Sequence, residues 1–373
     1  AEHLESLGME VTTGVAHTGV VGILKGGKPG PVVLLRADMD GLPVPERNDL
    51  PFKSLARGEY NGDDVPVMHA CGHDTHVAIM MGVAEILAEL RDEMPGTVKF
   101  VFQPAEEGAP KGEDGGAEMM VAEGVLDNPA VDAAFALHIN AIQEAGKIGY
   151  ASGPRYASVD DFKITVHGVQ AHGASPWMGV DSIVVSAQII NALQTIVSRN
   201  LQLTEQPAIV TVGSIHGGLR SNIIPEKVEL VGTIRALDSD MRVQIHRRIR
   251  EIADGVARSM GATVDVEIPY STSYPVTLND ADLTRAMLPV LQAVAGVDGV
   301  EEQKPITGAE DFSFFANRVP GFYISLGGRP PEKSESEVAA HHTPDFYVDE
   351  SGFDVGVKAM AAMAWEFLAN HSK

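Results

Sequence analysis

The stretch His69-Ala-Cys-Gly-His-Asp-Thr-His76 decides how this chain is interpreted, since it holds three histidines, an aspartate and the only cysteine of the protein. An apolar, helix-prone run from Val77 to Leu90 follows at once. Cys71 and His73 are two positions apart, a spacing that can aim both side chains at one centre in a loop but separates them on a regular helix. A lone cysteine or histidine is more often structural. The cluster instead predicts a metal site where a loop enters a helix.

Length and charge limit the classes of protein that fit. A chain of 373 residues exceeds one typical core, so two domains are expected. Lys and Arg number 28 against 51 Asp and Glu, and the formal net charge of -23 opposes binding to nucleic acid or anionic membranes. No apolar run is long enough to span a bilayer. A small molecule is therefore the expected partner.

Two further features concern the compartment and the start of the chain. A single cysteine excludes an internal disulfide and fits a reducing compartment, which favours a cytoplasmic location. Residues Ala1 to Gly8 are typical of the last two turns of a helix closed by glycine. We therefore expect that the chain begins within an element, and that an upstream segment, with any targeting signal, is missing.

Acidic residues follow two predicted strands. Pro31 to Arg36 is a β-rich run of the buried type, and Asp38 and Asp40 come after it. Carboxylates at the carboxyl ends of buried strands lie where open α/β sheets place their sites. The same two aspartates equally suit a turn ahead of Gly41, so both interpretations stay open.

The second of these strands, Thr97 to Phe102, ends at the adjacent acids Glu106 and Glu107. Adjacent acids usually form a solvated turn, but neighbouring residues point differently and can divide metal binding from proton transfer. A third strand, Val131 to Ile139, carries His138 near its end, where a core histidine is the alternative. Three strands thus direct metal-binding side chains towards one edge.

The middle of the chain changes character near Gly153. A strand-helix-strand-strand-helix-strand order follows, which is typical of a compact α+β sandwich inserted within the first domain. We predict an outer domain of residues 1-154 and 270-373 and an inserted domain of residues 155-269. Residues 47-66 and 111-116 are predicted as polar loops. The strands and helices predicted after residue 155 are Val159 to His167, Asp181 to Ser198, Ala208 to Ile215, Val228 to Arg235, Ser239 to Ser259, Thr263 to Ile268, Asp280 to Val294, Gly321 to Leu326 and Ser351 to Ala369.

Taken together, these segments resemble the peptidase M20 family of metal-dependent amidohydrolases, in particular the branch of N-acyl-amino-acid amidohydrolases with hippurate hydrolases and auxin-conjugate hydrolases. The resemblance covers essentially the whole chain. It implies an α/β fold with a mixed-sheet, phosphorylase/hydrolase-like catalytic domain and an inserted ferredoxin-like α+β domain through which a homodimer forms. The matching segments are Arg36 to Pro43, His69 to His76, Gln103 to Gly108, Leu137 to His138, His167 to Gly179, Gly308 to Phe312 and His342 to Phe346.

The resemblance implies a site for two divalent metals, Mn or Zn, with Ni or Co as further candidates. Cys71 would bridge them. Glu107 and His342 would complete one site, and His73 and His138 the other. The wider family has a metal-binding histidine in a His-x-Asp motif, whereas this chain has Arg36, which cannot ligate. His342 is preferred to its neighbour His341 on its spacing to Pro344 and Phe346.

The remaining implied roles concern catalysis and the substrate. Glu106 would take a proton from water and deliver it to the leaving amine. His172 would reach the scissile carbonyl from the partner subunit, and Asn222 and Arg235 would hold the substrate carboxylate. A loop histidine without a role and a structural ion pair are the alternatives for His172 and Arg235. Asp38 and Asp74 would orient ligands. Gly308 would line the pocket.

The implied reaction is hydrolysis of the amide bond of an N-acyl-L-amino acid, which releases a carboxylic acid and an amino acid. A dipeptidase or carboxypeptidase of the same family is an alternative, because both cleave an amide next to a free carboxylate. A cysteine hydrolase with Cys71 as nucleophile is a second alternative. A metal-binding protein without catalytic activity is a third.

Overall fold

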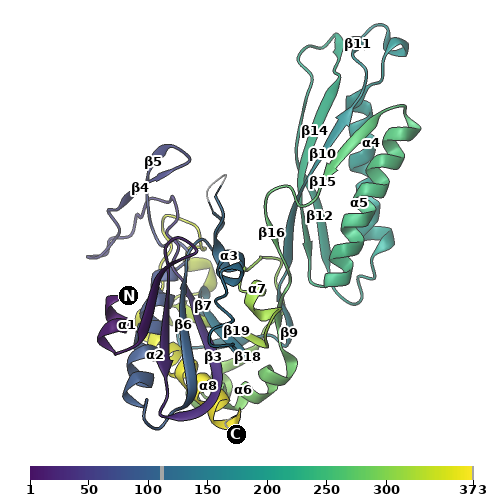
Figure 1. Ribbon diagram of the computed structural model, residues 1–373. Helices are drawn as coiled ribbons and strands as arrows, with labels where there is room; N and C mark the ends of the chain where they lie inside the picture. Colours follow the sequence, from purple (N-terminus) through teal and green to yellow (C-terminus); the bar gives the residue numbers. More distant parts are fainter. Residues whose placement is uncertain (110–112, 372–373) are drawn as a thin grey trace. The chain divides into compact units, whose positions relative to one another are not determined.

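The computed structural model describes residues 1-109 and 113-371, which form two compact units. Unit 1 consists of Ala1–Arg155, Leu278–Lys304 and Asp311–Lys373. Unit 2 consists of Tyr156–Thr277 and Pro305–Glu310. The chain therefore leaves unit 1 after residue 155, builds most of unit 2, returns to unit 1 at residue 278 and contributes residues 305–310 to unit 2 before it completes unit 1 (Figure 1).

Unit 1 is built around an eight-stranded mixed sheet in the order β1-β2-β6-β3-β7-β19-β8-β18. The centre is parallel, because β3 pairs in parallel with β6 and β7, and β19 pairs in parallel with β7. Its strands are β1 Glu10–Val15, β2 Gly19–Lys25, β3 Lys28–Asp38, β6 Pro95–Gln103, β7 Ala133–Glu144, β8 Ile148–Tyr150, β18 Val300–Glu302 and β19 Gly321–Arg329, with the separate hairpin β4 Arg57–Tyr60 and β5 Asp63–Pro66.

Helices pack against this sheet and bury its apolar side chains. The helices of unit 1 are α1 Glu2–Ser6, α2 His73–Glu89, α3 Gly116–Ala122, α6 Ala281–Ala295, α7 Ser313–Ala316 and α8 Phe353–His371. α2 and α8 contact each other and β3, while α3 and α7 contact each other and reach β6 and β19 respectively. Val33 and Leu35 of β3 belong to the core shared with α2 and α8. Burial of β3 under α2 and α8 explains why its sequence is a nearly continuous apolar run.

Unit 2 is a five-stranded antiparallel sheet with two helices packed against it. The strand order is β12-β14-β10-β15, and β16 also pairs with β10. The helices α4 and α5 contact β10 and β14, and share their apolar core. Its elements are β10 Ser158–His167, β11 Ala171–His172, α4 Ser182–Thr195, β12 Ala208–Gly217, β13 Ile223–Ile224, β14 Lys227–Ala236, α5 Ser239–Ser259, β15 Thr263–Glu267 and β16 Ser273–Tyr274; β9 Gly153–Tyr156 and β17 Thr277–Asn279 lie where the chain passes between the units.

The predicted strands and helices occur in the predicted order, but the short elements α3, α7, β8 and β18 were not predicted, and two segments differ from their predictions. The segment 47-66 was predicted as a loop, but its second half forms the β4–β5 hairpin. The predicted helix from Val77 begins four residues earlier, at His73, so that four residues of the quoted stretch, His73 to His76, lie in its first turn. The predicted loop from Lys111 to Gly116 falls partly outside the described residues.

Candidate metal and catalytic site

Gly72 allows the two flanking side chains, Cys71 and His73, to approach one centre. Its φ of +87° is in the left-handed region, which glycine adopts without steric cost. A Cβ atom at this position would lie 2.4 Å from Cγ2 of Ile139 and 3.2 Å from the ring of Phe346. The chain therefore turns tightly at Gly72, and α2 begins at the next residue.

Cys71 is the common member of two clusters of metal-binding atoms. The first cluster is Cys71, His73 and His138, and the second is Cys71, Glu107 and His342. In each cluster the ligand atoms lie within 4.8 Å of one another. The Cys71 Sγ is 3.5 Å from Nε2 of His138 and 3.3 Å from Nε2 of His342. The two clusters have the same composition as the two predicted metal sites, although ligation itself stays a prediction.

His73 has the properties expected of a metal ligand. Its side chain is fully buried, and neither ring nitrogen has a hydrogen-bond partner among the described residues. Burial lowers its pKa to about 4, so the imidazole is neutral at neutral pH. Buried polar atoms without partners are costly. A thiol, neutral imidazoles and a carboxylate are the donors that divalent transition metals prefer, so these residues fit a metal site.

The second cluster is closed by an ion pair between two chain segments. Nε2 of His342 lies 2.9 Å from Oε1 of Glu107. His342 has a φ of +64°, and its backbone N–H donates to the carbonyl of Ala70 at 2.8 Å. The contact with Glu107 raises the pKa of His342. Burial has the largest single effect on Glu107 and raises its pKa, but the hydrogen bond and charge of His342, together with His73 and Cys71, outweigh it, so that the net pKa is lowered.

Glu106 follows a sharp turn at the end of β6. Ala105 has a positive φ of +55°, an unusual conformation for alanine, and it separates the strand from the two glutamates. Glu106 is buried and forms a third cluster with His73 and Glu107, again within 4.8 Å. The turn therefore places a carboxylate beside both candidate metal sites.

Arg36, which the resemblance places at the position of a metal-binding histidine, forms a buried network. Its guanidinium donates to Oδ2 of Asp38 at 2.6 Å, to Oε1 of Gln103 at 2.9 Å and to Oδ1 of Asp311 at 3.0 Å. Burial raises the pKa of Asp38, but Arg36 and His76 outweigh it, and the net pKa lies well below the usual value. Asp38 is therefore an ionised carboxylate at the end of β3, held by Arg36 and His76.

Two histidines near the clusters were not selected from the sequence. His76 is buried, bonds to Asp38 and accepts a hydrogen bond from Ile139 N–H at 2.8 Å. Its position three residues after His73 was a usable signal, because residues i and i+3 share a helix face. His341 places Nδ1 3.5 Å from Cys71 Sγ, and its Nε2 accepts from Ala141 N–H at 3.1 Å. Both histidines of the pair 341-342 thus contact Cys71.

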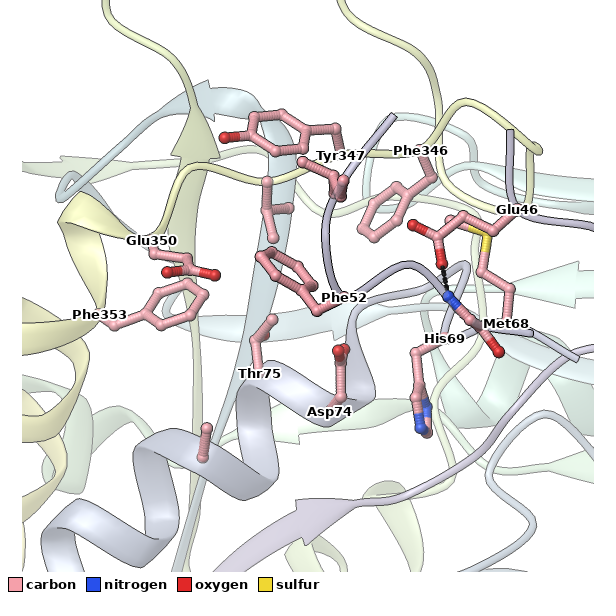
Figure 2. Close-up of a pocket in the computed structure, with 14 residues that line it drawn as sticks. Glu46, Phe52, Met68, His69, Asp74, Thr75, Phe346, Tyr347, Glu350 and Phe353 are labelled. Carbon is pink, nitrogen blue, oxygen red and sulfur yellow. Dashed lines mark hydrogen bonds between the residues drawn. The ribbon is translucent and has the colours of Figure 1, made fainter. Parts of the chain in front are cut away.

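Asp74 is not brought to the clusters. It lies on the exposed side of α2 and lines a cavity of about 310 Å³ together with His69, Phe52 and Phe346 (Figure 2). None of the five predicted metal ligands lines this cavity. Among the described residues Asp74 has no hydrogen bond or ion pair with a ligand. Its position gives no support to the prediction that it orients one.

The remaining predicted site residues lie in unit 2. His172 is on β11 and is paired with Ile223 of β13. The following residue, Gly173, donates its backbone N–H to the carbonyl of Asn222 at 2.8 Å. His172 and Asn222 are therefore close neighbours, and both are exposed. Arg235 is half-buried on β14, and burial lowers its pKa. Gly308 is exposed, and its carbonyl accepts from Ala157 N–H at 2.9 Å.

Comparison with known proteins identifies the family. The sequence profile described as Peptidase family M20/M25/M40 matches residues 34-366. This chain belongs to that family. The thermostable carboxypeptidase 2 of Saccharolobus solfataricus is 40% identical over 368 residues, which are 98% of this chain and 88% of that protein.

Other M20 relatives are named for amide hydrolysis. The N-acetylcysteine deacetylase of Bacillus subtilis is 35% identical and covers 93% of this chain and 84% of its own. The IAA-amino acid hydrolase ILR1-like 4 of Arabidopsis thaliana is 36% identical, and the match covers 98% of this chain and 79% of that protein. The Bacillus subtilis YXEP protein, described as a dinuclear metal binding peptidase from the M20 family, superposes with a TM-score of 0.78 at 32% identity over 99% of this chain and 90% of its own.

These findings confirm three of the predictions. The family and the mixed α/β fold class are those of M20 peptidases, and the protein is a hydrolase that acts on amide bonds. No helix among the described residues has the length and apolar character needed to cross a membrane.

Proposed function

We propose that this M20 hydrolase cleaves the amide bond of N-acyl-L-amino acids and releases a carboxylic acid and a free amino acid. The observation that carries the proposal is the pair of clusters that share Cys71, with Glu106 buried beside them. The names of the deacetylase and auxin-conjugate relatives support this substrate class.

Five residues would hold two divalent metals. Cys71 would be common to both, with His73 and His138 on one side and Glu107 and His342 on the other. When bound, the two ions would lower the pKa of a water molecule towards neutrality and polarise the amide carbonyl. Mn or Zn suits this mixed set of thiolate, imidazole and carboxylate ligands, and Ni or Co is also compatible with it.

The side chains supply the proton transfers and the orientation. Glu106 takes a proton from the attacking water and later gives it to the leaving amine. Arg235 and Asn222 would bind the free carboxylate of the substrate, since a guanidinium binds carboxylate through two parallel hydrogen bonds. His172 would contact the scissile carbonyl, and Gly308 would line the pocket. Asp38, ionised and held by Arg36, would keep the ligand histidines in place.

A carboxypeptidase or dipeptidase activity is the second candidate, and one observation favours it. The carboxypeptidase of Saccharolobus solfataricus is 40% identical and matches nearly the full chain. Both reactions cleave an amide next to a free carboxylate. The difference between them lies in the group on the acyl side, which is an amino acid in a peptide and a simple acyl group otherwise.

Two further proposals concern the assembly and the compartment. We propose a homodimer formed through unit 2, where Trp177, Met178 and Leu219 are largely exposed. Large exposed apolar residues that gather at one end of a domain are typical of an interface. The single cysteine supports a reducing, cytoplasmic location.

The test combines metal removal with a substrate panel. The protein is dialysed against a chelator and assayed with N-acetyl, N-benzoyl and dipeptide substrates before and after Mn²⁺ or Zn²⁺ is restored. We expect activity on N-acyl amino acids that returns only with metal. Cleavage of dipeptides alone would contradict this proposal and support the carboxypeptidase or dipeptidase activity. Activity that survives chelation would indicate a cysteine hydrolase.

The role of Glu106 is tested by Glu106→Gln, which keeps the size of the side chain but removes the base. We expect kcat to fall by about 10²- to 10⁴-fold, while two metal ions still bind. Glu118→Gln, at an exposed glutamate of α3, is the matched control and should retain the parent rate. An unchanged rate for Glu106→Gln would refute the mechanism.

A further inference from the structure

His76 lies between two of the candidate ligands, although the proposed reaction gives it no role. It is buried on the first turn of α2. Its ring is stacked on that of His73, with centroids 5.3 Å apart, and it meets the ring of His138 edge-on at 4.5 Å. His76 therefore packs against both imidazoles of the cluster that contains Cys71, His73 and His138.

The hydrogen bonds of His76 fix its protonation. Its Nε2 accepts from Ile139 N–H at 2.8 Å, so that nitrogen carries no proton. Its Nδ1 therefore bears the proton and donates to Oδ1 of Asp38. Asp38 is itself fixed by the guanidinium of Arg36 at 2.6 Å. Both ring nitrogens of His76 are thus occupied by the protein and are not available to a metal.

The connection continues through Ile139 to His138. The N–H of Ile139 is held by His76, and its carbonyl accepts a hydrogen bond from Nδ1 of His138 at 2.6 Å. A carbonyl can only accept, so Nδ1 of His138 carries the proton. The unprotonated nitrogen of His138 is then Nε2, which lies 3.5 Å from Cys71 Sγ. The ring of His138 is thereby preset in the tautomer and orientation that a ligand needs.

We propose that His76 is a positioning residue that, anchored by Asp38 and Arg36, sets the geometry of the metal site formed by Cys71, His73 and His138. The inference rests on the proposed function, since it assumes that these three residues bind a metal. Its rival is that His76 is itself a ligand, because Asp38, His73 and His76 also place ligand atoms within 4.8 Å of one another. The occupied nitrogens of His76 favour the positioning role.

The experiment measures Zn²⁺ binding by metal-free protein in competition with a chromophoric chelator, for the parent, His76→Ala, His76→Gln and Ile79→Ala. Ile79 is the matched control, because it is equally buried one turn further along α2. For His76→Ala we expect one of two dissociation constants to rise about 10- to 100-fold, with the other within threefold of the parent. The amide oxygen of Gln can replace Nε2 as the acceptor for Ile139 N–H. If the dissociation constant rises about 100-fold in His76→Ala, it should therefore be at least tenfold lower in His76→Gln than in His76→Ala.

Each other outcome has a defined meaning. Parental affinities at both sites in His76→Ala would overturn the inference, as would an equal loss in Ile79→Ala. A variant His76→Gln that binds only one Zn²⁺ would show that His76 is a ligand, which also overturns it. A parent protein that binds no Zn²⁺ would instead contradict the proposed function. Failures of the two proposals are therefore distinguishable.

Discussion

At the scale of single residues, the backbone at Gly72 decides whether two candidate ligands meet. Its positive φ and the 2.4 Å distance from a hypothetical Cβ to Ile139 exclude any side chain without rearrangement. Gly62 has the same φ of +87°, but nothing lies within 4 Å of a Cβ built there. The two glycines therefore share the conformational constraint, and only Gly72 adds a packing constraint.

We expect Gly62→Ala to lower the free energy of unfolding by about 1 to 2 kcal/mol through backbone strain alone. Gly72→Ala should lose roughly a further 1 to 3 kcal/mol from the clash, and it should weaken Zn²⁺ binding. Denaturant unfolding and metal titration of both variants measure these effects. Equal stability losses in the two variants would show that the contact with Ile139 relaxes at no cost.

The residue scale also shows where inference from the sequence ends. Cys71, His73, Glu107 and His138 were selected because a ligand-rich loop and strand ends are visible in the chain, and the structure brings them together with His342. His76 was missed, since its bonds to Asp38 and Ile139 depend on how α2 packs over β3 and β7. Asp74 was selected from the same stretch, but helix geometry turns it away from its neighbour His73.

At the scale of elements, a buried carboxylate ties α5 to the sheet of unit 2. Arg242 of α5 donates two hydrogen bonds of 2.7 Å to Asp160 of β10, and His246 bonds to the same carboxylate at 2.9 Å. Burial raises the pKa of Asp160, but these hydrogen bonds lower it more, and the net pKa lies below its ordinary value. Asp160 therefore stabilises the fold in its ionised form.

We expect Asp160→Asn to lower the free energy of unfolding by about 3 kcal/mol at pH 7, the lower end of the range for a broken buried ion pair, because Arg242 and His246 are partly exposed. The sign follows from the lowered pKa. The contribution is complete above the ordinary pKa of aspartate and is lost as the pH falls through the folded-state value. Denaturant unfolding from pH 7 to pH 3 should thus show the curves of the parent and of Asp160→Asn converge. Asp161→Asn, at a half-buried neighbour whose carboxylate accepts one hydrogen bond from Ser271 Oγ, should depart from the parent by less than Asp160→Asn does at pH 7.

The predicted elements succeeded where local signals and burial agree. The range Ser239 to Ser259 was predicted for a helix with the bounds that α5 has, since Met241, Ile245 and Ile249 repeat at helical spacing after the cap Asp238. The β4–β5 hairpin was missed because the turn residues of the segment were taken to indicate one continuous loop. Its turn is Asn61-Gly62, with both residues at positive φ, which is a strong hairpin signal.

At the scale of the whole molecule, the proposed homodimer depends on the β11–β13 end of unit 2. Leu219 is 97% exposed, and Trp177 and Met178 are 77% and 71% exposed. An aspartate at the centre of an apolar interface is buried without a partner, which is costly. We therefore expect Leu219→Asp to be monomeric when light scattering is measured during size-exclusion chromatography.

The matched control for the dimer is Val243→Asp. Val243 is 67% exposed on α5, away from the residues of the proposed interface in the sequence. This variant should elute as the parent does. A parent protein that is monomeric at micromolar concentration, or a Leu219→Asp variant that remains dimeric, would contradict the proposed interface.

The solitary thiol has a practical consequence for following this centre in solution. Cys71 is the only cysteine in the chain, it is almost fully buried, and its Sγ touches three imidazoles. Alkylation of the untouched native sequence therefore labels a single atom, with no background from other sulfhydryls. The rate of that labelling reports how often the loop around Gly72 opens. The thiol of Cys71 therefore serves as an intrinsic chemical probe of the candidate metal site.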